Sequence, residues 1–250
     1  MFNYKLLIQY DGGRYKGWQR LGDDENTIQG KIENVLSEMA GYKIEIIGSS
    51  RTDAGVHALA QIANFKLEEE MAEADIKKYL NRYLPQDISV LDVTSVHERF
   101  HSRYNTKDKT YVYKIWNEEH TNPFIRKHSM HVEKNLDLEE MKEASKHFIG
   151  EHDFTAFSNA KSKKKSMVRE IYSIELEEKA GLIEISIRGN GFLYNMVRKI
   201  VGILIEVGLG KQEIHSIAGM LKSKERFPAL MAEPQGLFLE KISFSSKNLK

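Results

Sequence analysis

The sequence of 250 residues contains no cysteine. Disulfide bonds and thiolate nucleophiles are therefore excluded, and a reducing compartment, the cytoplasm, is the expected location. The first ten residues mix polar side chains with apolar ones and contain no small-residue cleavage site, so we expect no signal peptide. Polar or charged residues interrupt the most apolar region, 192–209, which argues against a membrane span; they are Asn195, Arg198, Lys199 and Glu206.

The chain also lacks a basic excess, because 37 Lys and Arg residues face 36 Asp and Glu residues and the formal net charge is +1. Proteins that bind nucleic acid usually show such an excess. The two signs are nevertheless unevenly distributed. Acidic residues concentrate in 67–71 and 136–140, and basic residues in 14–16, 103–114, 161–165 and 198–199. This pattern fits a basic face that contacts phosphate, and an ordinary solvated surface explains it equally well.

No exact repeat and no low-complexity linker divides the chain. Apolar residues make up 41% of it, which is enough for a substantial core. Alternating apolar residues predict strands over 4–10, 43–48, 61–67, 88–96, 109–116, 168–178, 182–188 and about 237–244. Helices are predicted after the N-caps Thr27, Asp75 and Asp137, from about residue 192, and over 214–221. We therefore predict an α/β or α+β protein with a boundary near 103–107.

A polar loop, Ser-Ser-Arg-Thr-Asp-Ala-Gly-Val-His over 49–57, follows the second predicted strand. Gly55 allows a positive φ, so the loop can turn sharply and present Arg51 and Asp53. A nearby cation, Arg51 or His57, would lower the pKa of Asp53 and keep it ionised at neutral pH. Asp53 is then a nucleophile or an electrostatic stabiliser. The residues alone also allow a plain turn that Asp53 caps.

The stretch 190–204 is apolar nearly all round, which is typical of a buried helix. Arg198 lies inside it, and an unpaired buried charge is prohibitively costly. We therefore expect a carboxylate partner for Arg198. Asp53 is the obvious candidate, and Glu206 or an exposed helix face is the alternative. Removing one member of a buried ion pair costs about 3–5 kcal/mol.

Two further segments combine aromatic and basic residues. Tyr111 and Tyr113 follow a basic stretch that includes Arg103 and Lys109, a composition that suits stacking on a nucleobase, although a strand with one buried tyrosine face has the same pattern. The segment 10–19, Tyr-Asp-Gly-Gly-Arg-Tyr-Lys-Gly-Trp-Gln, either cradles phosphate or forms a tight turn with a packed tryptophan. It lacks the ending of a P-loop.

Motifs of other chemistries are missing. The sequence contains no HExxH and no GxSxG, and Tyr194 occupies the third glycine position of a dinucleotide fingerprint that begins at Gly189. We therefore expect no metal, hydride or serine-hydrolase mechanism.

Together these motifs resemble the tRNA pseudouridine synthase A family. The most specific is Arg-Thr-Asp-Ala-Gly-Val-His over 51–57. The others follow in the family's order over essentially the whole chain: 10–12, 17–19, 27–29, Asn81, 84–85, 100–103, 109–113, 153–157, Arg169, Ile171, 192–202, Pro234 and 236–237. One departure is Ser50, where the family usually has glycine, and this leaves a different RNA target open.

The resemblance implies two domains, 1–104 and 105–250. Each would have an RNA-recognition-like mixed or antiparallel sheet with flanking helices, and a basic cleft would lie between them. It also implies a homodimer that binds tRNA and converts uridine to pseudouridine at positions 38 to 40 of the anticodon stem-loop. No cofactor and no metal is expected, because the reaction is an isomerisation.

The resemblance also implies roles for individual residues. Asp53 is the essential carboxylate, which attacks or deprotonates the sugar. Tyr111 stacks on the flipped uracil and assists removal of the C5 proton, and Arg198 pairs with Asp53. Arg51 fills the space left by the flipped base or binds phosphate. The other expected RNA contacts are Arg14, Lys16, Trp18, Gln19, His57, Arg103, Lys109 and Arg169.

Two other functions stay open: the same chemistry on ribosomal RNA, and an RNA-binding protein or RNA chaperone without catalysis. The combination of Arg51, Asp53, Tyr111 and Arg198 speaks against a non-catalytic binder, since a carboxylate beside phosphate does not help binding. Both kinds of protein would bind RNA in a salt-dependent way, so only turnover separates them.

Overall fold

The computed structural model describes residues 1–22, 26–159, 166–225, 228 and 230–244, so the basic segment 161–165 lies outside the described residues. The chain divides into two compact units. The first is Met1–Lys109 with the chain from Phe238 on, and the second is Thr110–Leu237. Strands and helices alternate in both, which confirms the expected α/β (α+β) class. Within the described residues, no helix has the length and apolarity to cross a lipid bilayer.

The first unit is built on a mixed sheet in the order β4–β1–β3–β10, with β2 beside β3. β1 pairs antiparallel with β3 and β4, whereas β10 runs parallel to β3 with Phe238 opposite His57. The strands are β1 (Phe2–Tyr10), β2 (Ile47–Gly48), β3 (His57–Leu67), β4 (Ile88–Val96) and β10 (Leu237–Phe244). The expected second domain, 105–250, includes β10, but β10 pairs with β3 in the first unit.

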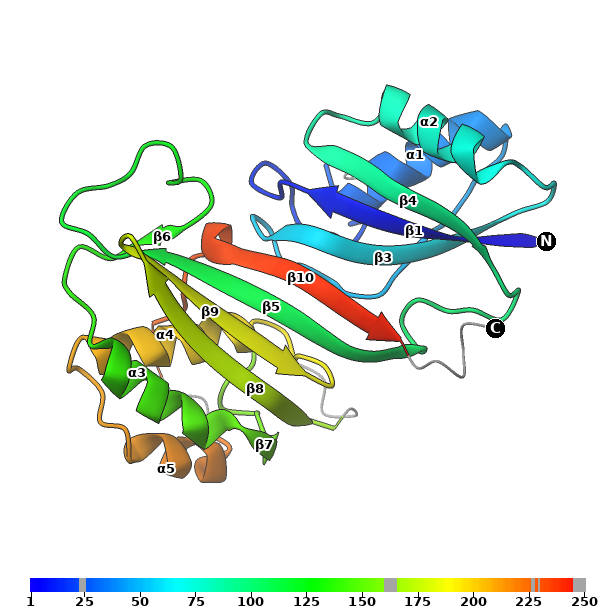
Figure 1. Cartoon of the computed structure of the whole chain (residues 1–250). Coiled ribbons are helices and arrows are strands. Elements are labelled where there is room, and N and C mark those ends of the chain that lie inside the picture. Colours follow the sequence, from blue (N-terminus) through cyan, green and yellow to red (C-terminus); the bar gives the residue numbers. More distant parts are fainter. Residues whose placement is uncertain (23–25, 160–165, 226–227, 229, 245–250) are drawn as a thin grey trace. The chain divides into compact units, whose positions relative to one another are not determined.

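Helices α1 (Ile28–Ala40) and α2 (Glu73–Tyr83) cover one face of this sheet (Figure 1). The alternate residues of β1 predicted to share a face are all buried, namely Tyr4, Leu6, Ile8 and Tyr10. Thr27 caps α1 as predicted, since its side chain accepts a hydrogen bond from Gly30 N at 3.2 Å. Gly41 ends α1 with φ 76°, in the left-handed region that glycine favours.

The predicted cap of α2 was wrong. The helix begins at Glu73 with Ala72 in the capping position, so Asp75 lies in its first turn. A carboxylate there still interacts favourably with the helix dipole. The helix ends at Tyr83, just before Leu84 and Pro85.

The sheet of the second unit has the order β5–β9–β8–β7, with β6 beside β5. Its helices lie on one side of it (Figure 1). Asp137 caps the first of them as predicted, accepting a hydrogen bond from Glu140 N at 3.0 Å. The elements are β5 (Thr106–Trp116), β6 (Met130–His131), α3 (Leu138–Ser145), η1 (Lys146–Phe148), β7 (Gly150–Asp153), β8 (Val168–Lys179), β9 (Leu182–Gly189), α4 (Met196–Gly208), α5 (Ser216–Ser223) and η2 (Pro234–Gly236).

Two predicted elements are shorter than expected. The strand expected over 43–48 is reduced to Ile47–Gly48. The helix expected from about residue 192 begins at Met196, because Asn195 before it adopts a left-handed conformation with φ 62°.

Candidate active site

Asp53 lies in the loop that joins β2 to β3 in the first unit, residues 49–56, here called the Asp53 loop. A hydrogen bond from Val56 N to Asp53 O, 3.2 Å long, closes its turn. Gly55 has φ 79°, the positive value that the sequence predicted. The side chain of Asp53 is half-buried, Arg51 is exposed and Thr52 is buried. The loop therefore presents a carboxylate and a guanidinium while the residue between them anchors it.

The glycine-rich segment 11–19 packs directly against this loop. Trp18 N donates a hydrogen bond to Thr52 O at 3.0 Å. A Cβ built on Gly17 would lie 2.7 Å from the same carbonyl oxygen, and a Cβ on Gly12 would lie 1.9 Å from Val56 O. Only glycine allows two backbones to approach so closely. Gly12 and Gly17 thus allow the segment 11–19 to pack against the Asp53 loop and stabilise it.

Trp18 lies in the core and is only 1% exposed. A Cβ on Gly48 would lie 2.4 Å from its indole Nε1, so the ring covers the end of β2. Tyr10 continues this support, with its hydroxyl 2.8 Å from Thr52 Oγ1. The structure thus has the tight turn with a packed tryptophan, and this favours a supporting role for Trp18 over the expected RNA contact. The side chains of Lys16 and Gln19 are exposed.

Arg14, also expected on RNA, forms an ion pair with Asp87 in the first unit. Tyr15 donates a hydrogen bond to the same carboxylate, with its hydroxyl 2.5 Å from Asp87 Oδ1. Hydrogen bonds to Tyr15 and Asp87 raise the pKa of Arg14. Burial, followed by the contact with Asp87, raises the pKa of Tyr15 to about 12. Arg14 is therefore charged and partly neutralised by its neighbour.

The base of the Asp53 loop is held by side chains from β3 and β5. Lys109 Nζ donates to Ser49 O at 2.7 Å, and Ser49 Oγ lies 2.6 Å from Thr106 Oγ1. Gln61 binds both backbone groups of Ser50, accepting from its N–H at 3.2 Å and donating to its carbonyl at 2.8 Å. Lys109, expected to contact RNA, is thus engaged at the base of the loop.

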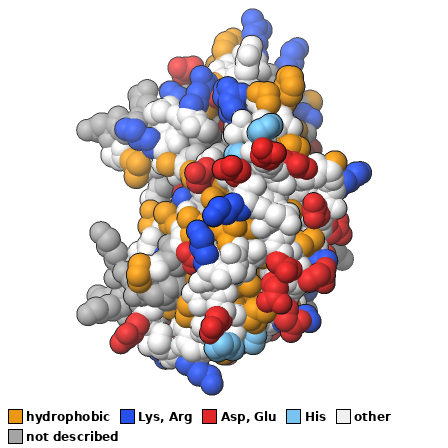
Figure 2. Space-filling model, turned by 90° about the vertical axis from the view of Figure 1, so that its left-hand side faces the viewer, with side chains coloured by type: hydrophobic (Ala, Val, Ile, Leu, Met, Phe, Trp, Pro, Cys, Tyr) orange, Lys and Arg blue, Asp and Glu red, His pale blue; other side chains and the backbone are white. Residues whose placement is uncertain are grey.

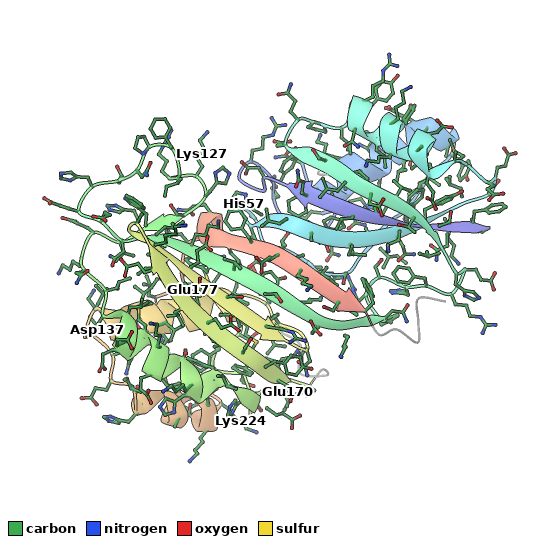
Figure 3. All side chains as sticks on the ribbon, in the orientation of Figure 1. His57, Lys127, Asp137, Glu170, Glu177 and Lys224 are labelled. Atoms are coloured by element: carbon green, nitrogen blue, oxygen red, sulfur yellow. The ribbon has the colours of Figure 1, made fainter. Side chains whose placement is uncertain are left out.

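His57 begins β3 at the end of the loop (Figure 3) and is 1% exposed. Its Nδ1 lies 3.0 Å from Gly12 N and 3.0 Å from Asp11 Oδ1. Its ring stacks on Phe238 with 4.8 Å between the ring centroids. This burial favours a structural role for His57 over the expected RNA contact.

Arg103 is on the loop between β4 and β5, and it lies near Arg51 of the Asp53 loop. Burial lowers the pKa of Arg103, and the charge of Arg51 lowers it further. Among the described residues, neither the guanidinium of Arg103 nor that of Arg51 forms an ion pair, whereas the guanidinium of Arg14 pairs with Asp87. Two neighbouring guanidiniums of this kind suit the oxygens of a phosphate group.

In the second unit, Tyr111 lies on β5 and is 6% exposed. Its ring meets Phe192 edge to face, with 5.2 Å between the centroids and an interplanar angle of 87°. Tyr113 lies two residues further along β5 and donates to Glu233 O at 2.7 Å, and its burial raises its pKa. The ring of Tyr111 is therefore fixed in one orientation by an aromatic neighbour.

Arg198 lies in the first turn of α4 and is buried, as the sequence predicted. Its Nε donates to Ala232 O at 2.7 Å, and Ala232 N donates back to Arg198 O at 3.1 Å. One turn later a Cβ on Gly202 would lie 1.7 Å from Leu230 O, so the segment 230–232 packs directly on the helix. The hydrogen bond to Ala232 O fixes the position of Arg198 Nε.

Arg169 on β8 is engaged by its own segment of chain. Its Nη1 donates to Ser166 O at 2.9 Å and to Val168 O at 2.6 Å, and burial lowers its pKa. Acidic side chains gather along the right-hand side of the face seen in Figure 2.

Two residues of β3 carried no expectation from the sequence: Gln61, which binds Ser50 in the Asp53 loop, and Asn64, which binds Ser102 in the loop after β4. Both lie inside β3 and are buried. A buried polar side chain within an apolar strand is a signal that a specific hydrogen-bond network is present, and the alternation of β3 could have revealed it.

A family model described as tRNA pseudouridine synthase matches residues 6–105 and 144–245. The tRNA pseudouridine synthase A 2 of Bacillus cereus (strain ZK / E33L) is 65% identical over 245 residues, which cover 98% of this chain and 100% of the relative. The tRNA pseudouridine synthase A of Bacillus sp. (strain KSM-64) is 66% identical over 244 residues, with the same coverage. A tRNA pseudouridine synthase A 2 of Clostridium tetani (strain Massachusetts / E88) is 45% identical over 245 residues, covering 97% and 99%.

Proposed function

Because the chain belongs to the tRNA pseudouridine synthase family, we propose that it isomerises uridine to pseudouridine at positions 38 to 40 of the tRNA anticodon stem-loop. The observation that carries this proposal is the Asp53 loop, where a half-buried carboxylate lies on a turn fixed by hydrogen bonds and close glycine contacts. Catalytic groups need such fixed positions, because small displacements of a reacting group are costly in rate.

The atoms of the reaction balance without a co-substrate. The bond between C1′ and N1 of uridine breaks, the uracil turns, and a bond forms between C1′ and C5. C5 loses its proton and N1 gains one. Substrate and product are isomers, so there is no net oxidation, and we propose that neither a cofactor nor a metal takes part.

Asp53 is the proposed catalytic carboxylate. It acts in its ionised form, either by attacking C1′ or by removing a proton from the sugar. We propose that Arg198 pairs with it and favours this ionised form, since a nearby cation lowers the pKa of a carboxyl group. The hydrogen bond from Arg198 Nε to Ala232 O supports a fixed direction for the guanidinium.

Tyr111 is the proposed partner of the flipped uracil. Its ring is held by Phe192, which leaves little rotational freedom to lose when a base stacks on it. Its hydroxyl would assist removal of the proton from C5. Arg51, exposed on the Asp53 loop, would fill the space left by the base or bind a neighbouring phosphate.

The first test measures tritium release from tRNA transcripts labelled at C5 of uridine, with no metal or nucleotide added. The wild-type protein should release tritium and Asp53→Asn should release none, while its circular dichroism and tRNA binding stay unchanged. Asp92→Asn is the matched control, because Asp92 is an exposed aspartate on β4 outside the Asp53 loop. An Asp53→Asn protein that keeps more than a small fraction of the wild-type rate would disprove the assignment.

The same assay separates the alternatives. Release from ribosomal RNA but not from tRNA would replace the proposed substrate, and binding of both RNAs without any release would point to a non-catalytic RNA-binding protein. Mapping of the modified nucleotides then tests positions 38 to 40. The homodimer, the basic cleft and the cytoplasmic location stay predictions. Sedimentation measures the oligomeric state, and cell fractionation measures the location.

A further inference from the structure

An exposed aromatic pair lies on the loop between β4 and β5, residues 97–105. The rings of His101 and Tyr104 stack with 4.1 Å between their centroids and an interplanar angle of 29°. Tyr104 is 80% exposed, so one face of its ring rests on the imidazole while most of its surface contacts solvent. The outer face of the Tyr104 ring is therefore accessible to a group that stacks on it.

This loop is held in place by buried amides. Asn3 Nδ2 donates to Phe100 O at 3.0 Å and Asn64 Nδ2 donates to Asn3 Oδ1 at 3.1 Å. Ser102 N and Ser102 Oγ both donate to Asn64 Oδ1, each at 2.9 Å. Phe100 is itself buried and packs on Phe244. The backbone beneath the aromatic pair is thus fixed by the sheet.

The imidazole of His101 is held by the loop backbone. Its Nδ1 accepts hydrogen bonds from Arg103 N at 3.2 Å and Tyr104 N at 3.3 Å. Burial, followed by the charge of Arg103, lowers the pKa of His101 below its ordinary value. Because Nδ1 accepts these two hydrogen bonds, the neutral form of the ring carries its proton on Nε2. A neutral, fixed ring is a suitable support for stacking.

The same loop is joined to the Asp53 loop. Thr106 Oγ1 donates to Ser102 O at 2.7 Å and lies 2.6 Å from Ser49 Oγ. Arg103 on the first loop lies near Arg51 on the second, and the two charges repel each other. Neither has an ion-pair partner among the described residues. The exposed aromatic pair therefore lies beside two cations that a phosphate would neutralise.

We propose that the His101–Tyr104 pair stacks on an unpaired nucleobase of the bound RNA while Arg103 and Arg51 bind its phosphates. Every base has a flat π-face, so the contact is tolerant of sequence and adds affinity near Asp53. The identity of the RNA, a tRNA anticodon stem-loop, rests on the proposed function. A protein partner is the competing occupant of the same surface.

The test compares Tyr104→Ala and Tyr104→Phe in the full chain by fluorescence anisotropy with a labelled anticodon stem-loop RNA. Tyr104→Ala should raise Kd by about 5- to 100-fold, and Tyr104→Phe should stay near wild type because it keeps the stacking ring. The matched control is Tyr83→Ala. Tyr83 is also exposed and adjacent to an arginine, Arg82, and the centroids of the Tyr83 and Tyr79 rings are 4.5 Å apart. It lies on α2, outside the loop that carries Tyr104. This control should leave Kd unchanged.

Arg103→Ala supplies an independent readout. If Arg103 binds a phosphate, the variant reduces the slope of log K against log salt by about one. A Kd for Tyr104→Ala within twofold of wild type, or an equal loss in Tyr104→Phe, would overturn the stacking proposal. So would loss of RNA binding in the Tyr83→Ala control to the same degree, and an unchanged salt slope in Arg103→Ala would overturn the phosphate contact.

Tritium release by the wild-type protein distinguishes a failure of the stacking proposal from a failure of the proposed function. Release by wild type together with normal RNA binding by Tyr104→Ala would leave the enzyme assignment standing and remove the stacking site. Absence of release by wild type together with Tyr104-dependent binding would support the stacking site and remove the enzyme assignment.

Discussion

Gly17 lies so close to Thr52 that a Cβ on it would be 2.7 Å from the Thr52 carbonyl oxygen. Its φ is 101°, a conformation that side chains rarely adopt. The next residue, Trp18, donates its N–H to the same oxygen at 3.0 Å. The segment 11–19 is thus joined to the residue immediately before Asp53.

Gly17→Ala should therefore disturb the Asp53 loop. The methyl group meets backbone atoms that cannot rotate away, and the left-handed φ adds strain of about 1–2 kcal/mol. We expect a loss of unfolding free energy greater than this strain alone and a large fall in tritium release. Urea denaturation and the release assay measure the two effects.

Gly41→Ala separates strain from close contact. Gly41 also has a positive φ of 76°, but a Cβ on it would meet nothing within 4 Å. This variant should lose only about 1–2 kcal/mol and keep its rate of turnover. Equal losses of stability and activity in the two variants would contradict the role given to the Gly17–Thr52 contact.

Lys109→Met tests whether Lys109 supports the loop or binds RNA. Its ammonium donates to Ser49 O, and a hydrogen bond to a charged group contributes about 1.5–3 kcal/mol. We expect slower tritium release and an unchanged slope of RNA affinity against salt. The control is Lys107→Met, an exposed lysine on the same strand. A slope reduced by about one in Lys109→Met would instead indicate a phosphate contact.

Gln61→Met removes two hydrogen bonds to Ser50 while nearly keeping the side-chain volume. Each lost hydrogen bond to the buried Ser50 costs about 0.5–1.5 kcal/mol. Urea denaturation should show this loss of stability. Gln9→Met, on the exposed side of β1, should show none, and a Gln61→Met protein as stable as wild type would contradict the prediction.

Tyr15 predicts a specific response to alkaline pH. Its pKa is raised from 10.0 to about 12 in the folded protein. Between these values the unfolded chain loses the phenolic proton and the folded chain keeps it, so the free energy of unfolding falls as pH rises through this window. Tyr15→Phe has no such proton. Wild type should therefore lose stability relative to Tyr15→Phe from pH 10 to 12, and a constant difference between the two would contradict this prediction.

Local signals in the sequence predicted much of the fold. Thr27 and Asp137 are N-caps as predicted, because this role depends on a few neighbouring backbone groups. Asp75 was misplaced, since several acidic residues near a helix start satisfy the same dipole preference. α4 begins later than predicted because Asn195 is left-handed, and asparagine adopts both this conformation and ordinary N-cap geometry, so the residue type alone does not place the helix start.

The site was predicted less completely. The motif over 51–57 predicted the positive φ of Gly55, a local property of one loop, whereas the catalytic role of Asp53 stays a prediction. The burial of Trp18 and His57 depends on strands that are distant in sequence, so their side chains were expected on RNA. The amide network of Asn64 has the same origin, because its partners come from β1 and from the loop after β4.

The pairing of β10 with β3 sets an order for folding during synthesis. The second unit, Thr110–Leu237, is contiguous and can fold as soon as it leaves the ribosome. The first unit cannot close its sheet until Phe238 has been made, because that residue lies opposite His57 and stacks on its ring. We therefore expect the turn that carries Asp53 to be completed late. A nascent chain that stops before β10 would leave the edge of β3 unpaired at His57, next to that turn.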